Sequence, residues 1–144
     1  MNRFKKALQL KGFPMDKAEL EFESMLNIPR DDYQHELERK CHQILKYHLK
    51  RNSVYAEFLK PHSIRSWEDV PILTKTDLQK PLQERLSRPY HPSTVFKNKT
   101  SGSSGHPFIF AKDKFAHALT WLHIFRVYKQ HGIDLNTSFE ARFY

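Results

Sequence analysis

Apolar residues recur at spacings of three and four between residues 31 and 51, which is the period of one face of an α-helix. Either Asp31 or Asp32 is placed to cap the first turn, because a short carboxylate accepts hydrogen bonds from the unpaired N–H groups there. The pattern predicts a helix that extends to about Arg51. The positions on its apolar face are Tyr33, Leu37, Cys41, Ile44, Leu45 and His48.

Shorter helices are predicted on both sides of this segment. Asp16 is expected to cap a helix that ends at Leu26 and carries an imperfect apolar stripe. Asn52 or Ser53 is expected to cap one or two helical turns, which end before Pro61 because proline cannot continue a helix. The first half of the chain is therefore predicted to be mainly helical.

The segment "WEDVPILTKTDLQKPL" carries a signal for one more helix. Thr74 is followed three residues later by Asp77, which resembles a capping box with Asp in the place of the usual Glu or Gln. This spacing predicts a helix that begins near Lys75.

The pattern changes from helical to strand-like after residue 92. "STVFKNKT" and "PFIFA" are short runs of β-branched and aromatic residues, and "SFEARFY" alternates apolar and polar positions, so all three favour strands. Asp113 is predicted to cap a helix that runs to about Gln130, with Gly132 just past its end. The predicted fold class is α/β, with a mainly helical region at residues 1–92 and a strand–loop–strand–helix–strand region at residues 93–144.

Composition and charge narrow this picture only slightly. The chain has 144 residues, 39% hydrophobic positions and a formal net charge of +8, which is compatible with a packed domain and with an anionic partner. Cys41 is the only cysteine, so no intramolecular disulfide is possible, and a reducing cytoplasm is predicted. No segment has the length or apolarity of a membrane span or a secretory leader, so neither export nor membrane insertion is expected.

The stretch "KTSGSSGHPFIF" is the strongest candidate for chemistry. Four hydroxyl side chains accompany two glycines, whose backbones allow several N–H groups to point at one anion. The motif is not a Walker loop, because Gly105 is followed by His106 and Pro107 and not by Lys. A flexible serine–glycine linker is the alternative. The strand-forming residues on both sides favour a loop of fixed shape, and therefore anion binding.

These residues carry a resemblance. "TSGSSGHP" resembles the signature loop of the adenylate-forming superfamily, (T/S)-S-G-(T/S)-(T/S)-G-x-P-K, and matches seven of its defining positions. "WEDVPILTKTDLQ" and "NSVYAEFL" are similar to segments of the phenylacetate-CoA ligase and CapK-like branch, in the same order and at fitting spacings, and "SFEARFY" is similar to a later segment. The resemblance spans most of the chain.

The resemblance implies an enzyme that activates a small carboxylic acid with Mg-ATP and usually passes the acyl group to coenzyme A. Its loop contacts the nucleotide phosphates, which makes nucleotide-binding candidates of Thr100, Ser101, Gly102, Ser103, Ser104 and Gly105. No catalytic residue is nominated. The chain lacks the family's later motifs, so it is expected to be the N-terminal part of such a ligase, of the phenylacetate-CoA ligase or capsule-biosynthesis type, and inactive alone. Residues 93–144 would then be the incomplete start of its AMP-binding domain, where the sheet of the large domain begins.

One departure concerns charge. Phe108 stands where the family often has Lys after the loop proline, and Lys99 and Lys112 are the nearby residues that would compensate.

Other chemistries receive less support from the sequence. The histidines lack the spacing of metal ligands, so no metal site is expected, and His117 and His123 lie on different faces of one helix. The stripe of Trp121, Phe125 and Tyr128 is expected in a core. Two alternatives to the ligase stay open. One is a non-catalytic interaction module, and the other is nucleic-acid binding by the basic helix "KCHQILKYHLKR", which intervening glutamates disfavour.

Overall fold

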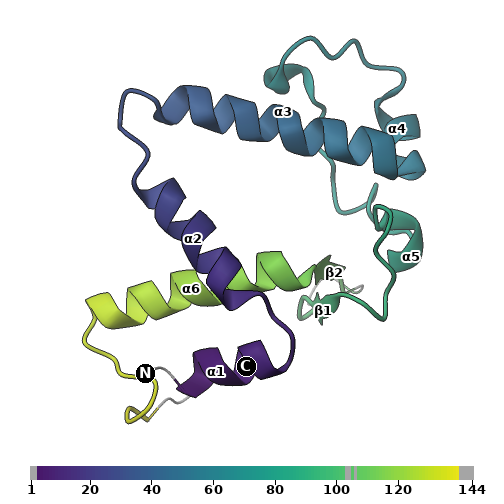
Figure 1. The fold of residues 1–144 in the computed structure, drawn as a ribbon. Coiled ribbons are helices and arrows are strands. Elements are labelled where there is room, and N and C mark those ends of the chain that lie inside the picture. The colour runs from purple at the N-terminus through teal and green to yellow at the C-terminus, as the bar shows by residue number, and fades with distance from the viewer. Residues whose placement is uncertain (1–2, 103–104, 106, 140–144) are drawn as a thin grey trace. The chain divides into compact units, whose positions relative to one another are not determined.

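The structure is a computed structural model that describes residues 3–102, 105 and 107–139 (Figure 1). It is a mixed α/β protein in which helices predominate and the sheet has two antiparallel strands, β1 and β2. Two compact units are present, one formed by residues 1–27 with 112–144 and the other by residues 28–111. The elements in chain order are α1 (Arg3–Leu10), α2 (Met15–Leu26), α3 (Tyr33–Arg51), α4 (Ser53–Leu59), η1 (Trp67–Asp69), α5 (Leu82–Arg85), β1 (Phe96–Lys99), β2 (Ile109–Lys112) and α6 (Lys114–Gln130).

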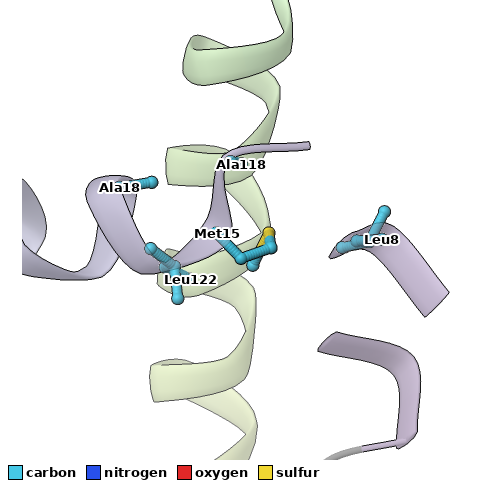
Figure 2. Close-up of a cluster of buried hydrophobic side chains, with 5 residues drawn as sticks. All are labelled: Leu8, Met15, Ala18, Ala118 and Leu122. Carbon is cyan, nitrogen blue, oxygen red and sulfur yellow. The ribbon is translucent and has the colours of Figure 1, made fainter. Parts of the chain in front are cut away.

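The first unit is built from α1, α2 and α6. Its core is a cluster of five buried apolar residues drawn from all three helices, with one alanine each from α2 and α6. Figure 2 shows this cluster, which consists of Leu8, Met15, Ala18, Ala118 and Leu122. Small side chains at a helix contact allow close approach, and Met15, which is 1% exposed, fills the remaining space.

Aromatic rings extend this core along α6. The ring centroid of Phe4 lies 4.4 Å from that of Trp121 and 6.1 Å from that of Phe125. The indole Nε1 of Trp121 donates a hydrogen bond of 3.0 Å to Nε2 of His117. The predicted core role is therefore confirmed for Trp121 and Phe125, since both rings pack against the buried cluster, whereas Tyr128 is half-buried and is not part of it.

In the second unit α3 and α4 pack together, with Leu45 and Leu59 buried. Asn52 separates the two helices and caps α4, because its side-chain oxygen accepts a hydrogen bond of 2.9 Å from the Tyr55 N–H. The predicted cap at this position is confirmed. The predicted helix of residues 31 to 51 is confirmed as α3, although the side chain of Asp32 makes no capping hydrogen bond.

Two predicted helix starts are wrong. Asp16 does not cap α2, since Pro14 occupies the capping position and the Asp16 carboxylate accepts hydrogen bonds from Gln9. No helix begins near Lys75, where residues 75–78 form only a turn. Thr74 and Asp77 do hydrogen bond to each other as predicted. Pro81 disfavours helical backbone in the residue before it. The residues between Thr74 and Pro81 are therefore too few for a stable helix.

The second half of the chain follows the predicted pattern. The two predicted strands form β1 and β2, and α6 begins after Asp113, whose carboxylate accepts a hydrogen bond of 2.7 Å from the Ala116 N–H. Gly132 lies just past the end of α6 with a φ of +69°. The last predicted strand lies mostly outside the described residues, and its first two positions, Ser138 and Phe139, are not in a strand. The boundary predicted near residue 92 separates the mainly helical region from the start of an incomplete AMP-binding domain, and it stays a prediction.

Candidate functional site

The candidate loop is the connection between β1 and β2, and both of its ends are held by hydrogen bonds. The backbone N–H of Thr100 donates to the Phe108 carbonyl oxygen over 3.0 Å. In return the Phe108 N–H donates to the hydroxyl oxygen of Thr100 over 2.9 Å. This reciprocal pair continues the hairpin by one step beyond the strands, so the loop starts and ends at fixed positions. A free serine–glycine linker would have no such closure.

The two glycines have backbone conformations that other residues rarely adopt. Gly102 has a φ of +74° and Gly105 a φ of +96°, and the N–H of Gly105 donates a hydrogen bond of 2.8 Å to the carbonyl oxygen of Gly102. A Cβ atom at position 102 would lie 3.1 Å from the backbone nitrogen and Cδ of Pro107. Position 102 therefore requires glycine for two independent reasons, the positive φ and the contact with Pro107.

The structure brings four of the six predicted binding residues into one turn. Thr100 and Ser101 are exposed with their hydroxyl groups at the start of the turn, and Gly102 and Gly105 close it. Ser103 and Ser104 lie outside the described residues. Hydroxyl groups and backbone N–H groups are donors that suit a phosphate, although the N–H groups of Thr100 and Gly105 already donate within the loop.

The two lysines expected to compensate for the missing loop lysine are placed differently. Lys99 is exposed at the end of β1, beside the start of the turn. Lys112 instead donates a hydrogen bond of 3.1 Å from Nζ to the Thr120 hydroxyl on α6, so its ammonium group already has a partner. Of the two, only Lys99 stays a candidate for phosphate contact.

Arg85, at the end of α5, is the cation that the structure places against the hairpin. Its Cζ lies 5.2 Å from the centroid of the Phe108 ring, at the position where the resembled family often has Lys. Its Nη2 donates to the Ile109 carbonyl oxygen over 2.7 Å, and its Nε donates to the Lys80 carbonyl oxygen over 2.9 Å. No local pattern in the sequence marks Arg85, because the Ile109 carbonyl that ties it to the hairpin lies 24 residues further along the chain.

Arg85 also lines a cavity of about 620 Å³ within the second unit. Most of its apolar wall comes from α4 and from the segment before Pro81. The residues of this apolar wall are Val54, Tyr55, Phe58, Leu73 and Leu78. The cavity has the size of many small-molecule sites and combines apolar walls with a few polar groups.

Two polar side chains on the α3 and α4 side of the cavity, those of Asn52 and His48, are held in place. Asn52 is buried, and while its oxygen caps α4 its Nδ2 donates a hydrogen bond of 2.8 Å to the Arg85 carbonyl oxygen. His48 shares a hydrogen bond of 2.7 Å between Nδ1 and the hydroxyl of the buried Ser87. Burial lowers the pKa of His48 and raises the pKa of Tyr55, so both groups are neutral at pH 7.

Comparison with known proteins gave no assignment, because no family model, curated protein or solved structure matches this chain. Within the described residues no group of three or more His, Cys, Asp or Glu side chains is arranged to hold a metal ion. Among these same residues no helix is long and apolar enough to cross a membrane.

Proposed function

We propose that the loop of residues 100–105 binds the phosphate groups of a nucleotide. The observation that carries this proposal is the closed turn between Gly102 and Gly105, with both φ angles positive and the turn held at its base by the Thr100–Phe108 pair. Preorganised N–H and O–H donors stabilise phosphate charge without having to rearrange. The resemblance to the signature loop of the adenylate-forming enzymes supports the same assignment from the sequence.

In this proposal the loop serves the ATP-dependent activation of a carboxylic acid. Mg²⁺ arrives with the nucleotide, the acid and ATP form an acyl-adenylate and pyrophosphate, and coenzyme A is the usual acceptor in the resembled family. The part played by this chain's own residues is to bind and orient the phosphates through the hydroxyl groups of Thr100 and Ser101 and through backbone N–H groups of the turn other than those of Thr100 and Gly105.

Isothermal titration with Mg-ATP, inorganic tripolyphosphate and adenosine tests the phosphate assignment. We expect Mg-ATP and tripolyphosphate to bind and adenosine not to bind, because the donors of the loop recognise phosphate oxygens. Gly102→Val should weaken binding at least tenfold, since strain of about 1–2 kcal/mol at a positive φ is added to the clash with Pro107. Ser63→Ala, at an exposed serine outside the loop, is the matched control and should bind like the wild type.

The outcome that would refute phosphate binding is adenosine binding as tightly as Mg-ATP, or Gly102→Val binding like Ser63→Ala. The complete reaction is a separate question. We expect no acid-dependent exchange between ATP and pyrophosphate by this chain alone, and exchange above the level of the Gly102→Val variant would overturn the interpretation of the chain as part of a longer ligase.

A further inference from the structure

The cavity beside α4 has apolar walls that are not fully covered by protein. Val54, Tyr55, Phe58, Leu73 and Leu78 line it, and each of these side chains is only partly buried. Covering partly exposed apolar side chains with a ligand removes their surface from water, which is favourable in proportion to the area covered. The body of a fitting ligand is therefore apolar.

The two carboxylates that line the cavity are already engaged by other groups. The Asp77 carboxylate accepts hydrogen bonds from the N–H and the hydroxyl of Thr74, at 2.8 Å and 2.6 Å, and these bonds lower its pKa. Glu57 lies 3.7 Å from the ammonium group of Lys60 and is largely exposed to solvent. Asp77 therefore stays ionised, but Thr74 holds its carboxylate through two hydrogen bonds, and the ammonium group of Lys60 offsets the charge of Glu57.

The two cations that line the cavity form no ion pair with a carboxylate among the described residues. Arg85 uses Nε and Nη2 for backbone carbonyls, which leaves the N–H groups of Nη1 without a hydrogen-bond acceptor in the described part of the chain. Lys80 makes no ion pair with any described carboxylate. The guanidinium group is held in place by the Ile109 and Lys80 carbonyls and by the Phe108 ring, so it meets an anion at little cost in side-chain freedom.

We propose that this cavity is a second binding site, separate from the phosphate loop, for a small amphipathic anion. The ligand has an apolar ring or chain, held by α4 and residues 73–78, and one carboxylate or sulfonate head group, held by Arg85 and Lys80. The site needs no nucleotide.

A series of probes with the same eight-carbon chain tests the sign of the charge. The full chain is titrated with octanoate, octanesulfonate, octanol and octylammonium in the absence of nucleotide, and binding is followed through backbone amide shifts by NMR. We expect both anions to bind, octanol to bind at least tenfold more weakly, and octylammonium to bind more weakly still. Comparison of octanoate with octanesulfonate distinguishes a carboxylate site from a general anion site. The largest shifts should fall on Tyr55, Phe58 and Leu78.

Variants test whether the anion binds in the cavity or elsewhere on the surface. Lys80→Gln should weaken binding of the better anion about threefold, and Arg85→Gln at least tenfold. Lys50→Gln, at an exposed lysine that does not line the cavity, should leave binding unchanged. If Arg85→Gln does not fold, the affinity of Lys80→Gln and the probe series decide whether the cavity binds an anion.

Three results would overturn the cavity proposal. They are octylammonium binding as tightly as the anions, amide shifts confined to residues away from the cavity, or equal affinities for Lys80→Gln and Lys50→Gln. None of these results affects the phosphate loop, because tripolyphosphate binding there is measured separately.

Discussion

Replacement of Asn52 by alanine is expected to destabilise the second unit by about 2–4 kcal/mol. The side chain is 8% exposed and acts at two places, since its oxygen caps α4 through the Tyr55 N–H and its Nδ2 donates to the Arg85 carbonyl. Loss of a helix cap costs about 1 kcal/mol. The partly buried Arg85 carbonyl also loses its donor, and a buried polar group left without its partner costs about 1–3 kcal/mol.

Urea unfolding followed by far-UV circular dichroism measures this loss of free energy. Asp113→Ala is the matched control, because the Asp113 side chain caps α6 through the Ala116 N–H over 2.7 Å. It should cost only about 1 kcal/mol. Asn52→Ser keeps a capping oxygen but lacks the amide donor, so its loss should fall between the values for the two alanine variants.

The refuting result is a loss below about 0.5 kcal/mol for Asn52→Ala, which is the size of an ordinary surface substitution. It would mean that the two hydrogen bonds of this side chain do not join α4 to Arg85. The wall of the cavity would then lack the support that the proposed anion site requires. A loss for Asn52→Ser equal to that for Asn52→Ala would assign the whole effect to the amide clamp and none to the cap.

Two further predictions concern the core and the pH dependence of stability. Leu122→Ala should cost about 2–5 kcal/mol in urea unfolding, because Leu122 is 6% exposed in the core of the first unit, whereas Leu20→Ala, at a residue 71% exposed, should cost under about 0.5 kcal/mol. Burial lowers the pKa of His48 and, with the nearby charge of Lys112, that of His117, so the unfolded chain binds these protons more readily. The free energy of unfolding should therefore fall as the pH drops below about 6.5. Measurements at pH 7.5 and 5.5 should show a smaller fall for His48→Gln than for the wild type, and an equal fall would contradict the assignment.

Elements with local signals could be predicted from the sequence. Asp113 and Asn52 cap α6 and α4 through N–H groups three residues ahead, and Gly132 has the positive φ expected after a helix end. Such contacts span only a few residues, so a pattern in the sequence is enough to find them. The glycine turn of the loop belongs to the same class.

The elements that were missed depend on distant partners. The N-terminal helix α1 was not predicted, because it is stabilised by packing and not by a local pattern. Its Leu8 side chain packs against α2 and against α6, which lies about a hundred residues later in the chain. The helix expected near Lys75 failed for the opposite reason. The local signal is present, because Thr74 and Asp77 form the expected hydrogen bond. The chain between them and Pro81 is too short to continue as a helix. The cavity likewise arises only where α4, α5 and the segment before α5 meet.

Phe108 connects the proposed phosphate loop with the proposed anion site. It stands where the resembled motif often has Lys, and in the structure its ring has a contact of its own. A lysine at this position would bring its own charge to the loop, whereas the phenylalanine ring lies against the guanidinium group of Arg85. The backbone of Phe108 closes the loop through Thr100, and the backbone of the next residue fixes Arg85. The adjacent residues Phe108 and Ile109 thus shape the proposed phosphate turn on one side and hold the cation of the proposed anion site on the other. Because each site has its own donors, Ser101 for one and Lys80 for the other, the two binding activities can be removed separately although they share this support.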